Sequence, residues 1–172
     1  MIDQTVLFTT DISDLKLTRF DLVVLPVNRC RTKKVEEVEI YCDKISIPLT
    51  WQIRHNDARL LEEDGLDPYP TIYGDFGISW FYTMLFDEEI LSRMPLLNFH
   101  AGEPGPHALK KAFDRQDTTI RCFWHRVDSG IDNGPIIVET TISLPDIFHE
   151  ARDLIITTGI CLFREITNGI NK

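Results

Sequence analysis

The hydrophobic positions of this 172-residue chain fall into two kinds of segment, which alternate along the sequence. Short, nearly continuous apolar runs such as Leu22 to Val27 are typical of buried parallel strands. Charged segments with regularly spaced apolar residues, such as Val35, Val38 and Cys42, indicate amphipathic helices. The pattern predicts strands at Thr5 to Thr10, Asp21 to Val27, Ile45 to Thr50, Phe76 to Tyr82, Pro95 to His100, Thr118 to Val127 and Pro135 to Ser143. It predicts helices at Lys33 to Lys44, at Asp87 to Arg93, from about His107, and at Asp146 to Ile166, with a short helix and a loop between Arg54 and Pro70.

The order of these elements predicts the fold class. Strands that alternate with helices indicate an α/β protein with an open, mostly parallel sheet and helices on both faces. The last two predicted strands flank a turn rich in glycine, aspartate and asparagine, so the sheet is expected to end in an antiparallel edge. The length fits one domain that spans residues 1–172.

Charge and composition narrow the classes of partner and compartment. A net charge of −9 argues against nucleic acid, because surfaces that follow a phosphate backbone need excess Lys and Arg. No apolar run approaches the length of a membrane span, and the N-terminus has no basic segment followed by a long apolar one. Four cysteines without a C-x-x-C pair fit a reducing compartment. We therefore expect a cytoplasmic protein with no membrane partner.

Candidate chemistry lies at the end of the strand that contains Asn98-Phe99-His100. Because a strand alternates its faces, Asn98 and His100 point one way while Phe99 points the other. In open α/β sheets, ligands bind beyond the carboxyl ends of the strands, where His100 falls. Asp132 lies in a glycine-flanked turn that could direct its carboxylate back into the same cleft. An amide donor, an imidazole and a carboxylate together suit attack on a carbonyl without a covalent intermediate.

Structural interpretations of the same residues remain open. Asn98 and His100 could cap the turn that follows the strand, and Asp132 could simply form its own turn. A metal site made by His100, His107, His125 and Asp132 is a further alternative. It is disfavoured because no H-x-x-x-H or H-E-x-x-H spacing is present, so no metal is expected.

Three motifs in this order resemble a known family. They are DFGISWFYTMLFDEEIL at Asp75 to Leu91, then LNFH ending at His100, then HRVDSGIDNGPII from His125. Together they resemble the 10-formyltetrahydrofolate-dependent formyltransferases, and the first looks most like the branch that acts on nucleotide-linked amino sugars. The resemblance covers roughly residues 75 to 145. It implies a Rossmann-like fold, 10-formyltetrahydrofolate as formyl donor, and a small-molecule amine as acceptor.

The resemblance also implies roles for individual residues. Asn98 would polarise the formyl carbonyl, His100 would support its developing charge and shuttle protons, and Asp132 would help to take the proton from the amine. The pterin ring of the folate would lie against two backbone segments. Their residues are Tyr82, Thr83, Met84 and Leu85, then Asp128, Ser129, Gly130 and Ile131.

Departures from the family bear on the acceptor and on the activity. The segment after the first strand, from Thr9 to Asp14, lacks the G-x-G-x-N motif of glycinamide ribonucleotide enzymes, so that acceptor is not expected. A methionyl-tRNA acceptor is not expected for a chain of net charge −9. The loop Ala101 to Gly105 is shorter than in the family, so a non-catalytic binding module stays open. A formyl-folate hydrolase or maturation factor is a further alternative, and the oligomeric state, a homodimer included, is left open.

Overall fold

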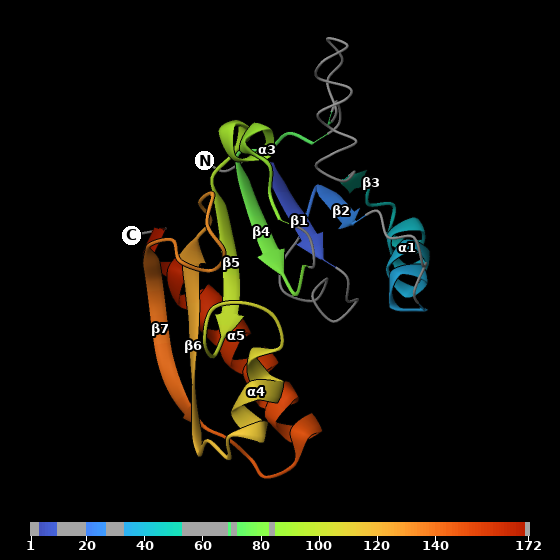
Figure 1. Cartoon of the computed structure of the whole chain (residues 1–172). Helices are drawn as coiled ribbons and strands as arrows, with labels where there is room; N and C mark the ends of the chain where they lie inside the picture. Colours follow the sequence, from blue (N-terminus) through green and yellow to red (C-terminus); the bar gives the residue numbers. More distant parts are fainter. Residues whose placement is uncertain are drawn as a thin grey trace. The chain divides into compact units, whose positions relative to one another are not determined.

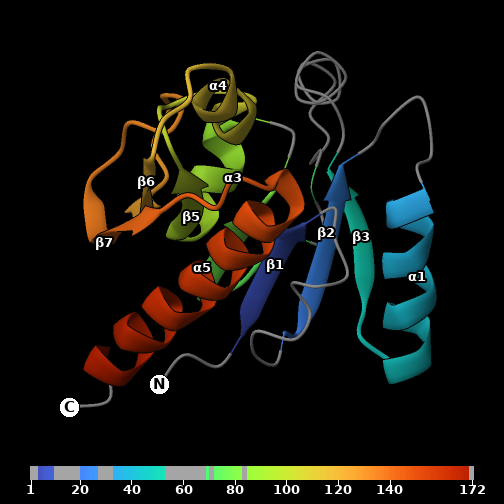
Figure 2. The same ribbon diagram turned by 90° about the horizontal axis from the view of Figure 1, so that it is seen from below.

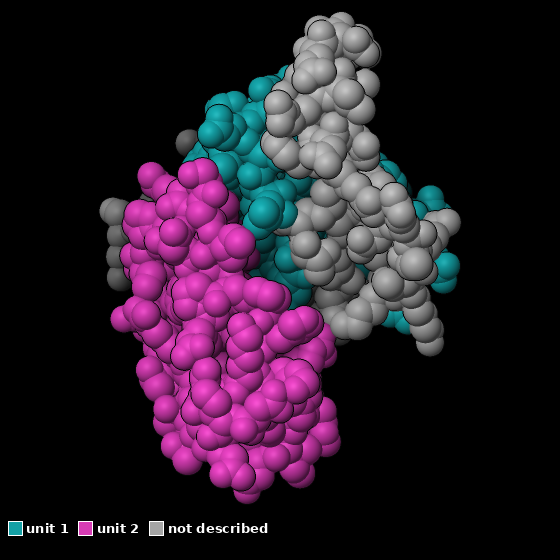
Figure 3. Space-filling model, in the orientation of Figure 1, with its two compact units in different colours: residues 1–96 teal, residues 97–172 magenta. Residues whose placement is uncertain are grey.

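The computed structural model describes residues 4–9, 20–26, 33–52, 69, 72–82 and 85–170. The chain divides into two compact units, Met1–Leu96 and Leu97–Lys172, which are coloured separately in Figure 3. Within the described part of the chain, no helix combines the length and the apolar character needed to cross a membrane.

The first unit is built on four parallel strands, labelled in Figure 1. They are β1 (Thr5–Thr9), β2 (Leu22–Pro26), β3 (Leu49–Gln52) and β4 (Phe76–Trp80). β1 pairs with β2 on one side and with β4 on the other, and β3 pairs with β2. In the described part of this unit the helices are α1 (Lys33–Ile45) and α3 (Glu88–Arg93).

The second unit is built on three antiparallel strands, β5 (Leu96–Ala101), β6 (Thr119–Arg126) and β7 (Ile136–Ser143). Its helices are α4 (Ala108–Asp114), which joins β5 to β6, and the long α5 (Phe148–Ile170). α5 packs against β6 and β7, as Figures 1 and 2 show from two directions. β6 and β7 pair along almost their whole length, with one irregularity between Trp124 and His125.

The strand order β3-β2-β1-β4-β5-β6-β7 confirms the predicted fold class. The strands β1, β2, β3 and β4 pair in parallel, and β5, β6 and β7 form the antiparallel edge. The expectation of a single domain stays a prediction. The short helix and loop predicted between Arg54 and Pro70, and the segment after Thr9, lie almost entirely outside the described residues.

One predicted strand was misplaced. The run Ile45 to Thr50 was expected to form a strand, but Ile45 closes α1 and the strand starts at Leu49. The end of the helix is satisfied by Ile47, whose N–H donates to the Cys42 carbonyl at 3.0 Å. Ser46 adopts a φ of 57°, which turns the chain away from the helix. Backbone groups at 46 and 47 are thus committed to ending the helix and cannot pair in a sheet.

The core of the second unit fixes β5 and β6 against α5. Phe99 and Trp124 face each other across the two strands, with ring centroids 5.4 Å apart. Trp124 is fully buried, and its indole N–H donates to the Gly159 carbonyl of α5 at 2.9 Å. Phe163 packs on the same indole at 5.2 Å. This packing commits one face of β5 and β6 to the core and leaves the other face for Asn98 and His100.

Candidate active site

The pairing of β5 with β6 places four side chains of interest on one face. Asn98 lies directly opposite His125, and His100 lies opposite Phe123. Directly opposed residues in an antiparallel pair point to the same side of the sheet. The structure therefore confirms that Asn98 and His100 share a face, and it adds His125 to them.

The turn between β6 and β7 carries Asp132 back over this face. The turn closes on itself because the Arg126 N–H donates to the Pro135 carbonyl at 2.9 Å. Gly134 is required there, since a Cβ atom at this position would lie 1.9 Å from the Arg126 carbonyl oxygen. Asp132 itself adopts a φ of 51°, a left-handed conformation that aspartate tolerates better than most residues.

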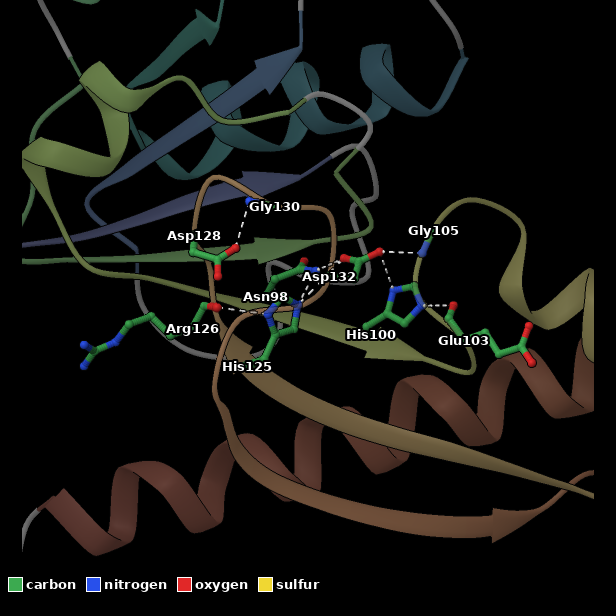
Figure 4. Close-up of polar contacts among 9 residues, drawn as sticks. All are labelled: Asn98, His100, Glu103, Gly105, His125, Arg126, Asp128, Gly130 and Asp132. Carbon is green, nitrogen blue, oxygen red and sulfur yellow. Dashed lines mark hydrogen bonds and ion pairs between the residues drawn. The ribbon is translucent and has the colours of Figure 1, made fainter.

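Asp132 is the point at which the candidate residues meet (Figure 4). Its Oδ1 accepts a hydrogen bond from Asn98 Nδ2 at 2.9 Å. Its Oδ2 accepts the backbone N–H of Gly105 at 2.9 Å and lies 3.3 Å from His100 Nδ1. One carboxylate thus joins β5, the loop after β5 and the turn after β6.

The imidazole of His100 is held between two oxygen groups. Nε2 lies 2.7 Å from the backbone carbonyl of Glu103, and Nδ1 faces the Asp132 carboxylate at 3.3 Å. A carbonyl oxygen only accepts, so Nε2 carries a hydrogen in its contact with Glu103. Only 13% of the His100 side chain and 16% of the Asp132 side chain are exposed, which limits screening by water. The arrangement therefore fixes the orientation of the His100 imidazole at the carboxyl end of β5.

His125 lies beneath Asn98 and Asp132 and is almost completely buried. Its Nδ1 lies 3.0 Å from the Arg126 carbonyl, so this nitrogen carries a hydrogen. Its Nε2 lies 3.1 Å from Asn98 Nδ2 and 3.7 Å from Asp132 Oδ1. A neutral His125 accepts from the Asn98 amide, whereas a protonated His125 points a donor toward the carboxylate. Either form fixes the orientation of the Asn98 amide.

The pKa of Asp132 is lowered below its ordinary value. The His125 imidazole contributes most to this shift, and the Gly105 N–H and the charges of His100 and His125 add to it. Burial acts in the opposite direction because it penalises the charged carboxylate. Asp132 is therefore ionised at neutral pH.

The residues predicted to contact a folate fall in both units. Asp128, Ser129, Gly130 and Ile131 belong to the same turn as Asp132, and the Asp128 carboxylate accepts the Gly130 N–H at 2.8 Å. Ile131 is exposed although it is apolar. These four residues directly precede Asp132 in the sequence, and they belong to the same unit as Asn98, His100 and Asp132.

The other predicted contact segment belongs to the first unit. Tyr82 is packed between Phe8 and Phe86, each with a ring centroid 5.5 Å away, and burial raises the pKa of its hydroxyl. Leu85 is exposed, and its carbonyl accepts a hydrogen bond from Gln52 Nε2 at 2.8 Å. Thr83 and Met84 lie outside the described residues.

Two contributors to the site were not predicted as such from the sequence. They are the Glu103 carbonyl and the Gly105 N–H, and both are backbone groups of the loop after β5. Backbone groups leave no side-chain signature, although the run G-E-P-G-P does mark a turn. No set of three or more His, Cys, Asp or Glu residues able to hold a metal was found in the described part of the chain.

Comparison with solved structures identifies the fold. Phosphoribosylglycinamide formyltransferase from Streptococcus pneumoniae TIGR4 aligns over 100% of both chains, with a TM-score of 0.72 and 16% identity. Glycinamide ribonucleotide transformylase 1 from Symbiobacterium toebii has a TM-score of 0.69 and 19% identity, over 96% of this chain and 85% of that one. For the enzyme from Bacillus Halodurans the TM-score is 0.66 and the identity 20%, over 94% and 91%.

No family model and no curated protein matches the sequence. At the identities of the solved structures, the likeness establishes a shared fold. It confirms at this level the resemblance that the three sequence motifs indicated, and it covers nearly the whole chain rather than the motifs alone.

Proposed function

We propose that this protein transfers a formyl group from 10-formyltetrahydrofolate to a primary amine of a small molecule. The observation that carries the proposal is the convergence of Asn98 and His100 on the carboxylate of Asp132. An amide donor, an oriented imidazole and an ionised carboxylate on one face are the groups that a formyl transfer needs. The shared fold with formyltransferase structures supports the same conclusion.

Two segments of the chain are proposed to contact the folate. A pterin needs backbone donors and acceptors at its edge and apolar groups against its rings. Leu85 and Ile131 are exposed apolar residues within the two proposed contact segments, and the turn from Asp128 to Ile131 presents backbone groups. When bound, the folate supplies a formyl carbon that is open to attack by an amine.

The roles of Asn98 and His100 follow from their contacts. A carbonyl oxygen that gains negative charge is stabilised by donors and positive charges that are already in place. Asn98 Nδ2 supplies the donor, and its direction is set by Asp132 and His125. His100 would support the developing charge and shuttle protons, and its ring is oriented by Asp132 and Glu103.

Asp132 would help to take the proton from the attacking amine. Its low pKa makes it a weak base toward a free amine but a sufficient one toward an amine that has attacked, whose N–H is far more acidic. The same carboxylate orients His100 and Asn98, so it has both a positioning and a proton-accepting role.

The amine of a nucleotide-linked amino sugar is the acceptor that we propose, on the resemblance of the Asp75 to Leu91 segment. The neighbouring structures carry the name of glycinamide ribonucleotide enzymes, but this sequence has no glycine between Thr9 and Asp14, where a phosphate loop would be needed. We further propose a cytoplasmic location. A non-catalytic binding module, or a formyl-folate hydrolase or maturation factor, remains the alternative.

Calorimetric titration with a stable formyl-folate analogue tests the proposal. Micromolar binding by the wild type that weakens in Asp132→Ala would support the cofactor and the site. Incubation with formyl-folate and a panel of amines, followed by mass spectrometry, would then identify the acceptor. Absence of binding at millimolar analogue would overturn the folate assignment. Binding with release of formate in the absence of any amine would favour the hydrolase.

A further inference from the structure

We infer that Arg115 is a positioning residue for His100 and acts through Glu103. The inference concerns the loop between β5 and α4, residues 102–107, and it rests on the function proposed above for its catalytic consequence. The contacts on which it depends belong to the second unit only.

The loop supplies one backbone group to each member of the His100–Asp132 pair. The Glu103 carbonyl accepts from His100 Nε2 at 2.7 Å, and the Gly105 N–H donates to Asp132 Oδ2 at 2.9 Å. In Figure 4, His100 and Asp132 lie between these two backbone groups and Asn98. The loop thus contacts both members of the His100–Asp132 pair.

The loop reaches this position through an unusual backbone path. Gly102, Gly105 and His107 all have positive φ values, of 95°, 100° and 61°. Few residue types favour such φ values, so the conformation of this loop depends on the contacts that its side chains make with neighbouring elements. At its start, the Gly102 N–H donates to the Arg121 carbonyl of β6 at 2.8 Å. Between Gly102 and α4, the side chain of Glu103 offers a second point of attachment.

Arg115 provides that second attachment. Its Nη1 donates to Glu103 Oε2 at 2.8 Å, and its Nη2 and Nε donate to Asp117 Oδ2 at 2.7 and 3.1 Å. The two hydrogen bonds to Asp117 therefore orient the guanidinium for its contact with Glu103. Its own backbone N–H donates to Lys111 at the end of α4, which fixes the residue to the helix. Arg115 links the end of α4 to the residue whose carbonyl faces His100.

The expected contribution is modest because this ion pair is partly exposed. The side chains of Arg115 and Glu103 are 45% and 65% exposed, and water screens such pairs strongly. We therefore expect loss of the pair to loosen the loop about twofold to fivefold rather than to unfold it. The effect should appear at His100 and should leave the fold intact.

The direct readout is the hydrogen on His100 Nε2. In a ¹⁵N-labelled protein, its exchange with water reports how firmly the Glu103 carbonyl holds it. We expect Arg115→Met to speed this exchange about twofold to fivefold, and Glu103→Met to do the same. The double variant should exchange no faster than either single one, because both remove the same contact. Lys110→Met is the matched control, since it breaks the Lys110–Asp114 pair on the same helix.

The outcomes separate this inference from the proposed function. Unchanged exchange in Arg115→Met, or additive effects in the double variant, would overturn the positioning role. Equal acceleration in Lys110→Met would also overturn it, since it would show a general loosening of α4. The catalytic consequence is a fall in kcat of about twofold to fivefold in Arg115→Met with KM for the amine unchanged. A wild type without formyl transfer would refute the proposed function, while the exchange measurement would still decide the role of Arg115.

Discussion

The amide nitrogen of Asn98 lies 2.9 Å from Oδ1 of Asp132, although the two residues are 34 positions apart in the sequence. β6 intervenes between them in the chain and supplies His125, which contacts both. The distance therefore depends on two local features at once. One is the pairing of β5 with β6, and the other is the sharp turn from β6 into β7. The candidate site is a product of this antiparallel edge.

Replacement of Asn98 by alanine is expected to lower formyl transfer by about 10²–10³-fold, because it removes a fixed donor to the developing oxyanion. Steady-state kinetics with formyl-folate and the amine would measure the loss, which should lie in kcat. Asn168→Ala, on an exposed position of α5, is the matched control and should be indistinguishable from the wild type. A variant of Asn98 that retained most of the activity would contradict the assigned role.

The low pKa of Asp132 predicts how stability depends on pH. A carboxyl whose pKa is lower in the folded than in the unfolded state stabilises the fold above its unfolded pKa, ordinarily 3.8. This stabilisation is lost as the pH falls through the folded value. We therefore expect Asp132→Asn to be less stable than the wild type at neutral pH, with a difference that shrinks below pH 3.8.

Urea unfolding of both proteins across this pH range would measure the difference. Asp114→Asn is the control, because Asp114 is exposed and pairs only with Lys110 in the described contacts of its side chain. A gap between Asp132→Asn and the wild type that stays constant down to low pH would show that the carboxylate charge contributes nothing to folding.

The sequence predicted the face on which the site lies but not its full membership. Strand periodicity alone placed Asn98 and His100 together and Phe99 in the core, and the structure confirms both. The proximity of His125 depends on the register between β5 and β6, which follows from long-range packing of Trp124 against α5. Such a register cannot be deduced from one strand's own pattern.

The position of Asp132 was a hypothesis that local sequence could support only in part. The run S-G-I-D-N-G-P indicates a turn, but not that its carboxylate points back to β5. That direction depends on the φ of 51° at Asp132 and on the close approach of Gly134 to the Arg126 carbonyl. The contribution of the loop after β5 could not be predicted from the sequence either, because it comes from backbone groups of Glu103 and Gly105.

Gly134→Ala tests how the turn is held. The new Cβ would meet the Arg126 carbonyl oxygen, a backbone atom that cannot move without disturbing the pairing of β6 with β7. We expect a loss of about 1–3 kcal/mol in the free energy of unfolding, as for other overpacked sites. Chemical denaturation would measure it, with Ser129→Ala, exposed in the same turn, as the control. Equal stability of the two variants would mean that the turn adapts readily.

Gln52→Leu tests the link between the end of β3 and the proposed folate segment. Gln52 is fully buried, and its Nε2 holds the Leu85 carbonyl at 2.8 Å, while its Oε1 has no hydrogen-bond partner among the described residues. Leucine is close to glutamine in size and removes both the bond and the unsatisfied oxygen. The two effects on stability oppose each other, so we expect the free energy of unfolding to change by less than about 1 kcal/mol.

Folate binding should respond more than stability does. Without Gln52, the backbone at Leu85 loses its anchor, and the affinity for a formyl-folate analogue should fall about fivefold, the worth of one neutral hydrogen bond. Calorimetric titration would measure this change, and Gln4→Leu, an exposed position before β1, is the matched control. If Gln52→Leu bound the analogue as tightly as the wild type, the backbone at Leu85 would not belong to the folate site. If it bound more weakly with unchanged stability, the backbone at Leu85 would belong to the folate site.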